Sequence, residues 1–347
     1  MEYIIYDQSG KPQALLQNVT SIQWNPRYWE SGSAEIHARP TDTNVKYLIE
    51  HNRVVCKDRN EILFIDYVQR SDQTSDGDDM IIHGKLDNLG ARINTSTVAI
   101  TNVEEGLRKL ITNNQRGLDI HLVGARGLTA KVTRTETTWA TLRESFEDFC
   151  QASGLGWREV VSNGQLNTLD IYQGSVKKGA RFSDDLGNII SQEYTKNLEE
   201  YANYLYILGE DQGTSRKQVI LDKRIEGEPI LEGYIDARDL QSTYKDANGT
   251  ERTYSDTEYT AILKARGEAK YAEMLSKAYQ FECELYEANR VAVLGRDYDL
   301  GDIVPITSRR FCVQNYARIT GIKFVEEENI ETQVSLELTI ETQEVLK

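Results

Sequence analysis

Apolar and polar residues alternate with a period of two through most of the first 88 residues. Over Ser33–Ala38 every second residue is apolar, which is the pattern of a strand with one buried face. The residues Asp58-Arg59-Asn60 separate two further apolar runs and therefore predict a hairpin. Many short strands joined by short turns, with one short helix over 41–49, indicate a small β-barrel or sandwich over residues 1–88.

The hydrophobic period becomes helical between residues 89 and 173. The run Asn102–Glu105 has the spacing of a capping box, and a second helix is predicted over 138–152. The predicted apolar face of the second helix comprises Trp139, Leu142, Phe146, Phe149 and Cys150. Gly154 is expected to end this helix, and Asn163-Gly164 predicts a hairpin between the strands that follow. We interpret this segment as a small α+β module.

Strand patterns return after residue 174 and are interrupted by the longest predicted helix. Ser255 and Glu258 have the spacing of a capping box, and the helix that they start runs to about Ala278. Its expected inward residues are Tyr259, Ile262, Ala269, Ala272 and Leu275. We predict a second β-rich domain over 174–347 with a helical insertion around 255–278. The fold class is thus α+β and β-rich, and the sequence leaves open how the later strands are partitioned.

The net charge differs among the same three segments of the chain. The 347 residues carry a formal net charge of −15, and 39% of them are hydrophobic, which is enough to form real cores. The net charge is −5 over residues 1–88 (9 basic, 14 acidic), zero over 89–173 (9 and 9) and −10 over 174–347 (22 and 32). So acidic a chain is unlike a sequence-specific DNA-binding protein, which would present a basic face.

Membrane and targeting signals are not expected in this chain. No run approaches the roughly 20 apolar residues that a membrane helix needs. The N-terminus has no basic segment followed by a long apolar run, so we interpret Met1–Asp7 as a first strand and not as a signal peptide. We therefore expect a soluble protein made in the cytoplasm, without membrane insertion.

Residues that commonly carry chemistry are scattered and have no recognisable motif spacing. The histidines are His37, His51, His83 and His121, and the cysteines are Cys56, Cys150, Cys283 and Cys312. The cysteines show no CxxC pair and are expected to be buried reduced thiols. Asp76-Gly77-Asp78-Asp79 lacks the rest of a calcium loop and is expected to be a solvated turn. We predict no catalytic residue, no cofactor and no metal site.

Three further groups of residues are each expected to be structural. In Asp297–Asp302, Gly301 is expected to be a turn residue that leads into a strand. Glu326-Glu327-Glu328 is expected at a hairpin tip. Trp24 and Trp29 are expected to pack in the core or at a subunit interface, although exposed aromatic residues at this density are also typical of sugar binding.

One series of segments resembles a known protein family. The series is Gly32–Pro40, Asn52–Val55, Ile62–Val68 and Ile81–Arg92, and a later one is Tyr298–Val304. Together with the order of elements, it resembles the tail-tip or baseplate hub proteins of long-tailed phages, also known as the N-terminal modules of tail-associated lysins. The order of elements is similar over nearly the whole chain, whereas the motifs themselves are short.

The resemblance implies two related β-barrel tube domains joined by the α+β module. It implies a homotrimer whose six barrels form a ring that continues the tail tube. Such a hub binds the distal tail protein, the tail tube or tape-measure protein, and a tip or fibre protein. Because the two segments that would form the tube are the acidic ones, DNA is expected to pass through an acidic channel without specific binding. The implied location is the tail tip of a virion assembled in the bacterial cytoplasm. Many relatives carry an additional lytic domain, which is not implied here because the chain stops after its last strand.

Two other functions remain open on sequence alone. One is a cell-wall hydrolase that acts through a pair of carboxylates, since acidic residues are plentiful. The other is a carbohydrate-binding receptor module that uses Trp24, Trp29 or some of the 19 tyrosines. A structural hub without enzymatic activity is the function that the sequence favours.

Overall fold

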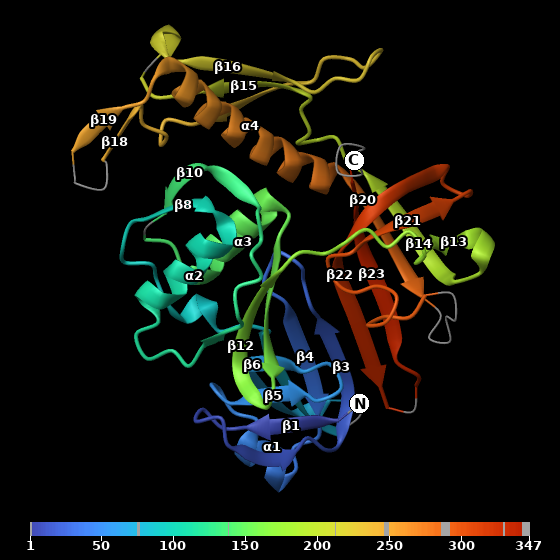
Figure 1. Ribbon diagram of the computed structural model, residues 1–347. Coiled ribbons are helices and arrows are strands. Elements are labelled where there is room, and N and C mark those ends of the chain that lie inside the picture. Colours follow the sequence, from blue (N-terminus) through green and yellow to red (C-terminus); the bar gives the residue numbers. More distant parts are fainter. Residues whose placement is uncertain are drawn as a thin grey trace.

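The computed structural model describes residues 2–74, 77–137, 139–211, 213–245, 250–285, 292–328 and 330–341. Strands dominate the fold, and most of them join one large sheet of 16 strands (Figure 1). The β-rich α+β class predicted from the sequence is therefore confirmed. Within the described residues the strand pairing shows large antiparallel sheets and does not close into a barrel.

The elements fall into four groups, and the fourth is inserted within the third. The first contains β1 (Tyr3–Tyr6), β2 (Pro12–Leu15), β3 (Val19–Asn25), β4 (Ser33–Ala38), α1 (Asp42–Tyr47), β5 (Arg53–Cys56), β6 (Glu61–Thr74) and β7 (Gly77–Lys85). The second, which we call the module, contains β8 (Val98–Asn102), α2 (Val103–Asn114), β9 (His121–Leu122), β10 (Lys131–Thr137), α3 (Leu142–Ser153), β11 (Gly156–Ser162) and β12 (Gln165–Tyr172).

The remaining elements form a second strand group that is interrupted by an insertion. The strand group contains β13 (Phe182–Ser183), β14 (Ile189–Lys196), β20 (Tyr279–Leu285), β21 (Ile303–Ser308), β22 (Val313–Glu327) and β23 (Gln333–Ile340). The insertion contains β15 (Tyr204–Leu208), β16 (Gln218–Asp222), β17 (Glu232–Asp236), β18 (Thr243–Lys245), β19 (Glu251–Thr253) and α4 (Asp256–Ala278). The insertion is larger than the single helix expected there, because α4 is joined by its own three-stranded sheet and its own apolar core.

Eight strands of the large sheet lie side by side in one antiparallel series, which we call the eight-strand series. Its order is β14-β20-β23-β22-β3-β4-β7-β6, and each neighbouring pair is antiparallel. The two strand groups meet where β3 pairs with β22, with Trp24 opposite Phe324. In Figure 1 this junction is where the blue N-terminal strands meet the red C-terminal strands.

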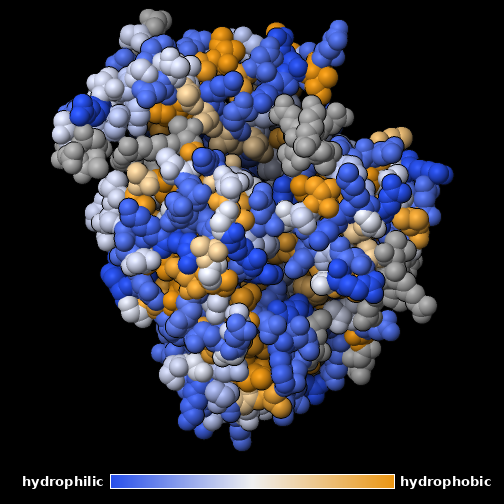
Figure 2. Space-filling model, in the orientation of Figure 1, coloured by the Kyte–Doolittle hydropathy of each residue, from blue (hydrophilic) through white to orange (hydrophobic). Residues whose placement is uncertain are grey.

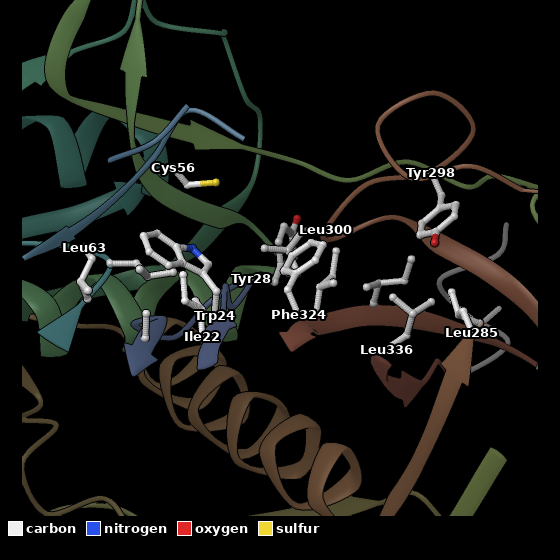
Figure 3. Packing of buried hydrophobic residues seen from close by; sticks show 14 of the residues in the cluster. Ile22, Trp24, Tyr28, Cys56, Leu63, Leu285, Tyr298, Leu300, Phe324 and Leu336 are labelled. Atoms are coloured by element: carbon white, nitrogen blue, oxygen red, sulfur yellow. The ribbon is translucent and has the colours of Figure 1, made fainter. Parts of the chain in front are cut away.

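One apolar core fills both strand groups, because each strand of the series turns alternate residues to the same side. Phe281 is completely buried in this core. Trp24 and Leu336 are also completely buried there, and Phe324 belongs to the same core (Figure 3). The expectation that Trp24 lies in a core is confirmed. Three of the four cysteines are also buried as free thiols, as predicted, whereas Cys312 is exposed.

Tyr28 joins the two strand groups to the module. Its ring is fully buried, and its hydroxyl donates to the Gly154 carbonyl at 2.9 Å while accepting from the Gly174 amide at 3.0 Å. Gly156 and Gly301 lie against the ring so closely that a Cβ on either one would fall 2.1 Å from a ring carbon. Only glycine fits beside this ring. Gly301 also has φ +91°, so the predicted turn role is confirmed.

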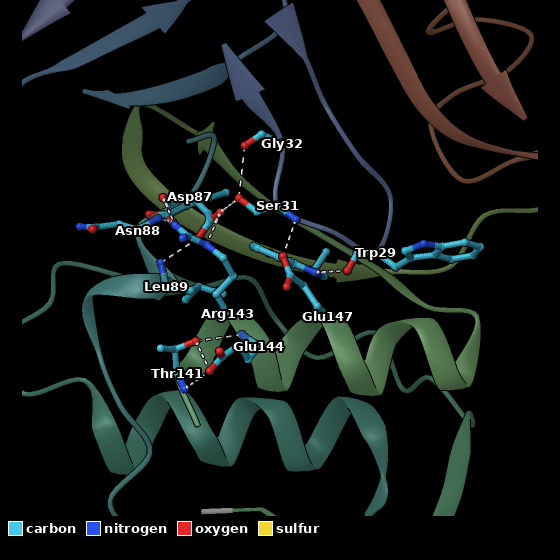
Figure 4. A network of polar contacts seen from close by, with 12 residues as sticks. Trp29, Ser31, Gly32, Asp87, Asn88, Leu89, Thr141, Arg143, Glu144 and Glu147 are labelled. Atoms are coloured by element: carbon cyan, nitrogen blue, oxygen red, sulfur yellow. Dashed lines mark hydrogen bonds and ion pairs between the residues drawn. The ribbon is translucent and has the colours of Figure 1, made fainter. Parts of the chain in front are cut away.

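A polar network fixes the module against the β3–β4 connection (Figure 4). Arg143 Nε donates to Asp87 Oδ1 at 3.0 Å, and the Ser31 amide donates to Glu147 Oε1 at 2.9 Å. The indole of Trp157 donates to the Trp29 carbonyl at 2.9 Å. Asp87 is almost completely buried, so its pairing with a guanidinium offsets the cost of burying its charge.

Helix starts and turns were largely predicted by local signals. Asn102 caps α2, and Ser255 with Glu258 forms the full capping box of α4. Asn163 and Gly164 both have positive φ, as a tight hairpin requires. The predicted start of α3 was wrong. Thr141 and Glu144 form its capping box, so the helix begins at Leu142.

Two predicted helix contacts were also wrong. Trp139 precedes the cap of α3 and is 73% exposed, whereas the sequence placed it on the buried face. Ala272 of α4 is exposed, because the buried residues of α4 other than Ala278 lie between Tyr259 and Gly267. Gly154 does end α3 in the left-handed conformation, as expected.

Tyr28→Phe is expected to lower the free energy of unfolding by about 1–2 kcal/mol, because the Gly154 carbonyl and the Gly174 amide lose their shared partner. Urea unfolding followed by tryptophan fluorescence measures the change. Tyr67→Phe removes a hydroxyl from a half-exposed ring and should change stability by less than about 0.5 kcal/mol. Equal effects of the two substitutions would contradict the bridging role of Tyr28.

Candidate functional site

The outer face of the eight-strand series carries the polar half of each strand. Because side chains alternate across a strand, burying the residues that flank Glu282 in sequence forces Glu282 itself outward. The same applies to Glu35 and His37, which flank the buried Ile36. We call this surface the polar face. The alternation in the sequence already predicts which residues lie on the polar face. It does not predict which of these residues lie next to one another on neighbouring strands.

Acidic side chains predominate on the polar face. The described carboxylates are Glu35, Asp79, Glu193, Glu282, Glu284, Glu327 and Glu337, and the basic side chains beside them are Lys85, Lys323 and Arg27. Such a surface repels polyanions over about 8 Å at physiological salt. The sequence predicted acidity in this part of the chain, and the structure shows which of these residues share a face.

Three glutamates lie directly opposite one another across three strands. Glu193 pairs with Glu282, and Glu282 pairs with Glu337. Burial raises the pKa of Glu282, and the facing carboxylates of Glu337 and Glu193 raise it further. Like charges in directly opposite positions destabilise a sheet. Arg27 forms an ion pair with Glu337 and relieves part of this repulsion.

Two histidines and two carboxylates form a second cluster on the polar face. His37 contacts Glu35 Oε1 at 2.7 Å through Nε2 and Asp79 Oδ2 at 3.0 Å through Nδ1. His83 Nδ1 lies 3.3 Å from Glu35 Oε2. Burial lowers the pKa of His37, but its hydrogen bonds to Glu35 and Asp79 outweigh burial and leave the pKa raised. Strand pairing between β4 and β7 brings these residues together, and sequence spacing gave no sign of it.

The other candidates lie apart from this cluster. His121 contacts Asp119 at 3.0 Å in the module, and His51 is exposed. Asp302 Oδ1 accepts from the Ser175 amide at 2.7 Å, and its Oδ2 accepts from the Asp299 amide. These acids therefore stabilise a turn, as predicted. Asp76 lies outside the described residues, whereas Asp79 belongs to β7 and contacts His37, so the prediction of a solvated turn was wrong for Asp79. Over the described ranges, three or more His, Cys, Asp or Glu residues nowhere gather in a way that could hold a metal ion.

A cavity of about 400 Å³ lies where the module meets the two strand groups. Arg59, Arg158 and Glu159 are among the residues that line it. Glu159 is almost completely buried, and burial raises its pKa to about 8. Its Oε2 accepts a hydrogen bond from the Asn88 amide at 2.9 Å. The sequence did not single out Glu159, because its environment is created entirely by tertiary packing.

The described helices include none that is long and apolar enough to cross a membrane. The family model that describes the siphovirus ReqiPepy6 Gp37-like proteins matches residues 100–339, which is more than half of the chain. The chain belongs to this Gp37-like family. None of the curated proteins matches the chain in sequence.

Solved structures of tail proteins, two of them from prophages, share the fold of this Gp37-like protein. The 43 kDa tail protein of prophage MuSo2 from Shewanella oneidensis has a TM-score of 0.65 at 13% identity, covering 98% of both chains. The tail protein from Neisseria meningitidis MC58 has a TM-score of 0.63 at 11% identity, covering 98% of this chain and 97% of its own. The prophage tail protein gp18 from Listeria monocytogenes EGD-e has a TM-score of 0.56 at 9% identity, covering 100% and 97%.

These likenesses confirm, at the level of family and fold, the resemblance to phage tail proteins that the sequence predicted. The Gp37-like match begins at residue 100, whereas the structural likeness extends over nearly the whole chain. The N-terminal strand group is therefore similar to known tail proteins in its fold rather than in a family sequence pattern.

The cluster around His37 is expected to make the Gp37-like protein more stable as the pH falls from 8 to 6. A raised pKa in the folded state means that the stabilisation is fully present below about pH 6.5 and is lost as the pH rises through the folded pKa. His37→Gln should remove up to about 1 kcal/mol of this gain. Urea unfolding at both pH values measures it, with His51→Gln as the control. An unchanged pH dependence in His37→Gln would contradict the assignment.

Proposed function

We propose that this chain is the structural hub of a phage or prophage tail tip and that three copies form a ring. The observation that carries the proposal is the antiparallel eight-strand series. Because eight is even, the end strands β14 and β6 run in opposite directions. One copy's β6 and the next copy's β14 can therefore pair in the same antiparallel sense as every other neighbour in the series. Three copies of eight strands would close a ring of 24 strands.

The two outer edges of the series support this closure. Within the described residues, β14 pairs with β20 alone, and the part of β6 beyond Ile65 pairs with β7 alone. A long unpaired edge is a liability that proteins normally cover or pair. Closure into a ring would pair the backbone groups of both edge strands at once, whereas a monomer leaves them unpaired. In this arrangement each strand group is one tube domain of the ring, so the chain divides into tube domains at 1–88 and 174–347 around the module at 89–173.

The polar face lines the channel in the proposed ring, and the carboxylates that line it include Glu193, Glu282 and Glu337. An acidic wall lets DNA pass without binding, since phosphates and carboxylates repel each other. The outer surfaces contact the distal tail protein, the tail tube or tape-measure protein, and a tip or fibre protein. The hub is part of the virion, is assembled in the host cytoplasm and acts without enzymatic activity.

Proline substitutions at two neighbouring positions of β14 test the ring. Successive residues of an edge strand direct their amides alternately toward the partner strand and outward. Of Gln192→Pro and Glu193→Pro, one is therefore expected to abolish trimers while leaving the melting temperature nearly unchanged. The other should lower the melting temperature, because it removes a bond to β20. Light scattering and negative-stain microscopy report the trimer, alone and with co-expressed tail proteins. A wild-type chain that stays monomeric in both settings would overturn the proposal.

Charge reversal tests the acidic channel. The triple variant Glu193→Lys, Glu282→Lys and Glu284→Lys should bind linear duplex DNA more tightly than a closed circle of the same sequence, because only a free end can enter a closed ring. The affinity of the variant for linear DNA, measured in a mobility-shift assay, should fall steeply as the salt concentration rises.

A control variant with the same charge change on the insertion distinguishes the channel from general basicity. Glu226, Glu228 and Glu251 are exposed there, and changing each to Lys should raise binding to linear and circular DNA equally. Equal binding of both DNA forms by the polar-face variant would show that this face does not line a closed channel.

A further inference from the structure

The three-stranded sheet of the insertion is covered on one face only. Its strand order is β16-β15-β17, and α4 packs under the sheet, between it and the module (Figure 1). Leu205, Ile207, Val219, Leu221 and Ile235 point into the core that the sheet shares with α4. The opposite face carries the alternate residues of the same strands, and no described element packs across it.

Aromatic and apolar residues gather on this uncovered face. Tyr206 on the central strand lies directly opposite Ile220 on one side and Tyr234 on the other. Tyr204 lies two residues away on the same strand, with its ring centroid 5.4 Å from that of Tyr206. Tyr234 is 73% exposed and Ile220 is 47% exposed. We call these four residues the tyrosine platform. Figure 2 shows scattered orange apolar residues among hydrophilic ones at the top of the molecule, where the insertion lies in Figure 1.

Hydrogen bonds and ion pairs hold two of the rings in place. The Tyr206 hydroxyl donates to Glu232 Oε1 at 3.0 Å. The Arg224 guanidinium lies 5.2 Å from the Tyr204 ring centroid and donates to Asp222 Oδ1 at 2.8 Å. Fixed rings lose little conformational entropy when a ligand stacks on them.

A second ion-paired carboxylate borders the platform beyond Tyr234. Asp236 accepts from Arg238 Nε at 2.9 Å and from Arg216 at 2.6 Å. Ion-paired carboxylates and guanidinium groups therefore lie on two sides of the rings. Hydrogen-bonding groups of both kinds are what polyhydroxylated ligands need.

We propose that the tyrosine platform binds a neutral saccharide chain. The apolar C–H face of a pyranose ring stacks on a tyrosine ring, while its hydroxyls bond to Asp222, Glu232 and Asp236. The platform belongs to a single copy of the chain, so the proposal does not depend on ring formation. It adds to the hub a surface for a glycan, such as one exposed on a cell envelope.

The size and charge of the platform favour a saccharide over other occupants. A stable protein interface uses roughly 20–30 residues on each side, far more than the four residues here. Nucleic acids need a clear excess of basic side chains, whereas arginines and carboxylates alternate around these rings. Two or three sugar rings match a row of side chains across three strands that are about 5 Å apart.

Binding of purified chain to chitohexaose, maltohexaose and an array of neutral oligosaccharides tests the proposal. Saturable binding to at least one probe is expected. In Tyr234→Ala and Tyr206→Ala, calorimetry should show Kd raised about tenfold or more, which corresponds to about 1.4 kcal/mol. Tyr234→Phe keeps the stacking surface and should bind nearly as well as the wild type. Trp139→Ala is a matched control, because Trp139 is equally exposed but lies in the module.

Three results would overturn the proposal. The first is no saturable binding to any array glycan at millimolar concentration. The second is binding that survives Tyr234→Ala and Tyr206→Ala unchanged while circular dichroism shows both variants folded. The third is loss of co-purification with other tail proteins in these variants without any glycan binding, which would make the platform a protein contact. Because none of these results depends on the trimer, failure here leaves the hub proposal standing.

Discussion

The packing of the two strand groups and the module against one another depends on the burial of one tyrosine. Tyr28 lies in the connection between β3 and β4, yet its hydroxyl bonds to the module and to the chain that leaves it. Arg318 of the second strand group lies 5.5 Å from its ring centroid. Glycine is required beside the ring on two sides, at Gly156 and Gly301. The two strand groups and the module therefore share one packed junction instead of being separate bodies on linkers.

The continuous sheet follows from this junction. With the two strand groups held together, β3 and β22 pair edge to edge and bury an edge that each group would otherwise expose. The same pairing puts the polar residues of eight strands on one surface. That surface concentrates like charges, of which Glu193, Glu282 and Glu337 are the clearest case. Such an arrangement costs stability, and proteins retain unfavourable arrangements of this kind mainly where function requires them.

The insertion differs from the large sheet, because the exposed face of its small sheet carries aromatic and apolar side chains instead of acidic ones. Its small sheet buries one face against α4 and leaves tyrosines on the other. Exposed apolar patches on soluble proteins usually mark interaction sites. The Arg224 guanidinium lies over the Tyr204 ring, and Glu232 accepts a hydrogen bond from the Tyr206 hydroxyl, so charged groups border the rings. The two surfaces are thus chemically distinct, since the polar face is acidic whereas the tyrosine platform is aromatic and balanced in charge.

Local signals in the sequence determined much of this protein. Alternation predicted β4 and β23, capping residues predicted the starts of α2 and α4, and Gly154 predicted the end of α3. These succeed because each depends on neighbours within a few residues. The predicted placement of Trp139 was wrong because the apolar pattern extends back to Trp139, whereas the Thr141–Glu144 capping box starts the helix only at Leu142.

Tertiary structure alone decided the rest. The cluster of His37 with His83, the glutamate row and the pairing of β3 with β22 join residues that are tens to hundreds of positions apart. The buried state of Glu159 and the extent of the insertion also depend on such contacts. Sequence periodicity specifies which side of a strand is apolar, but it does not predict which other strand pairs with it. The sequence therefore determined the acidity and the strands, and packing decided which charges face one another.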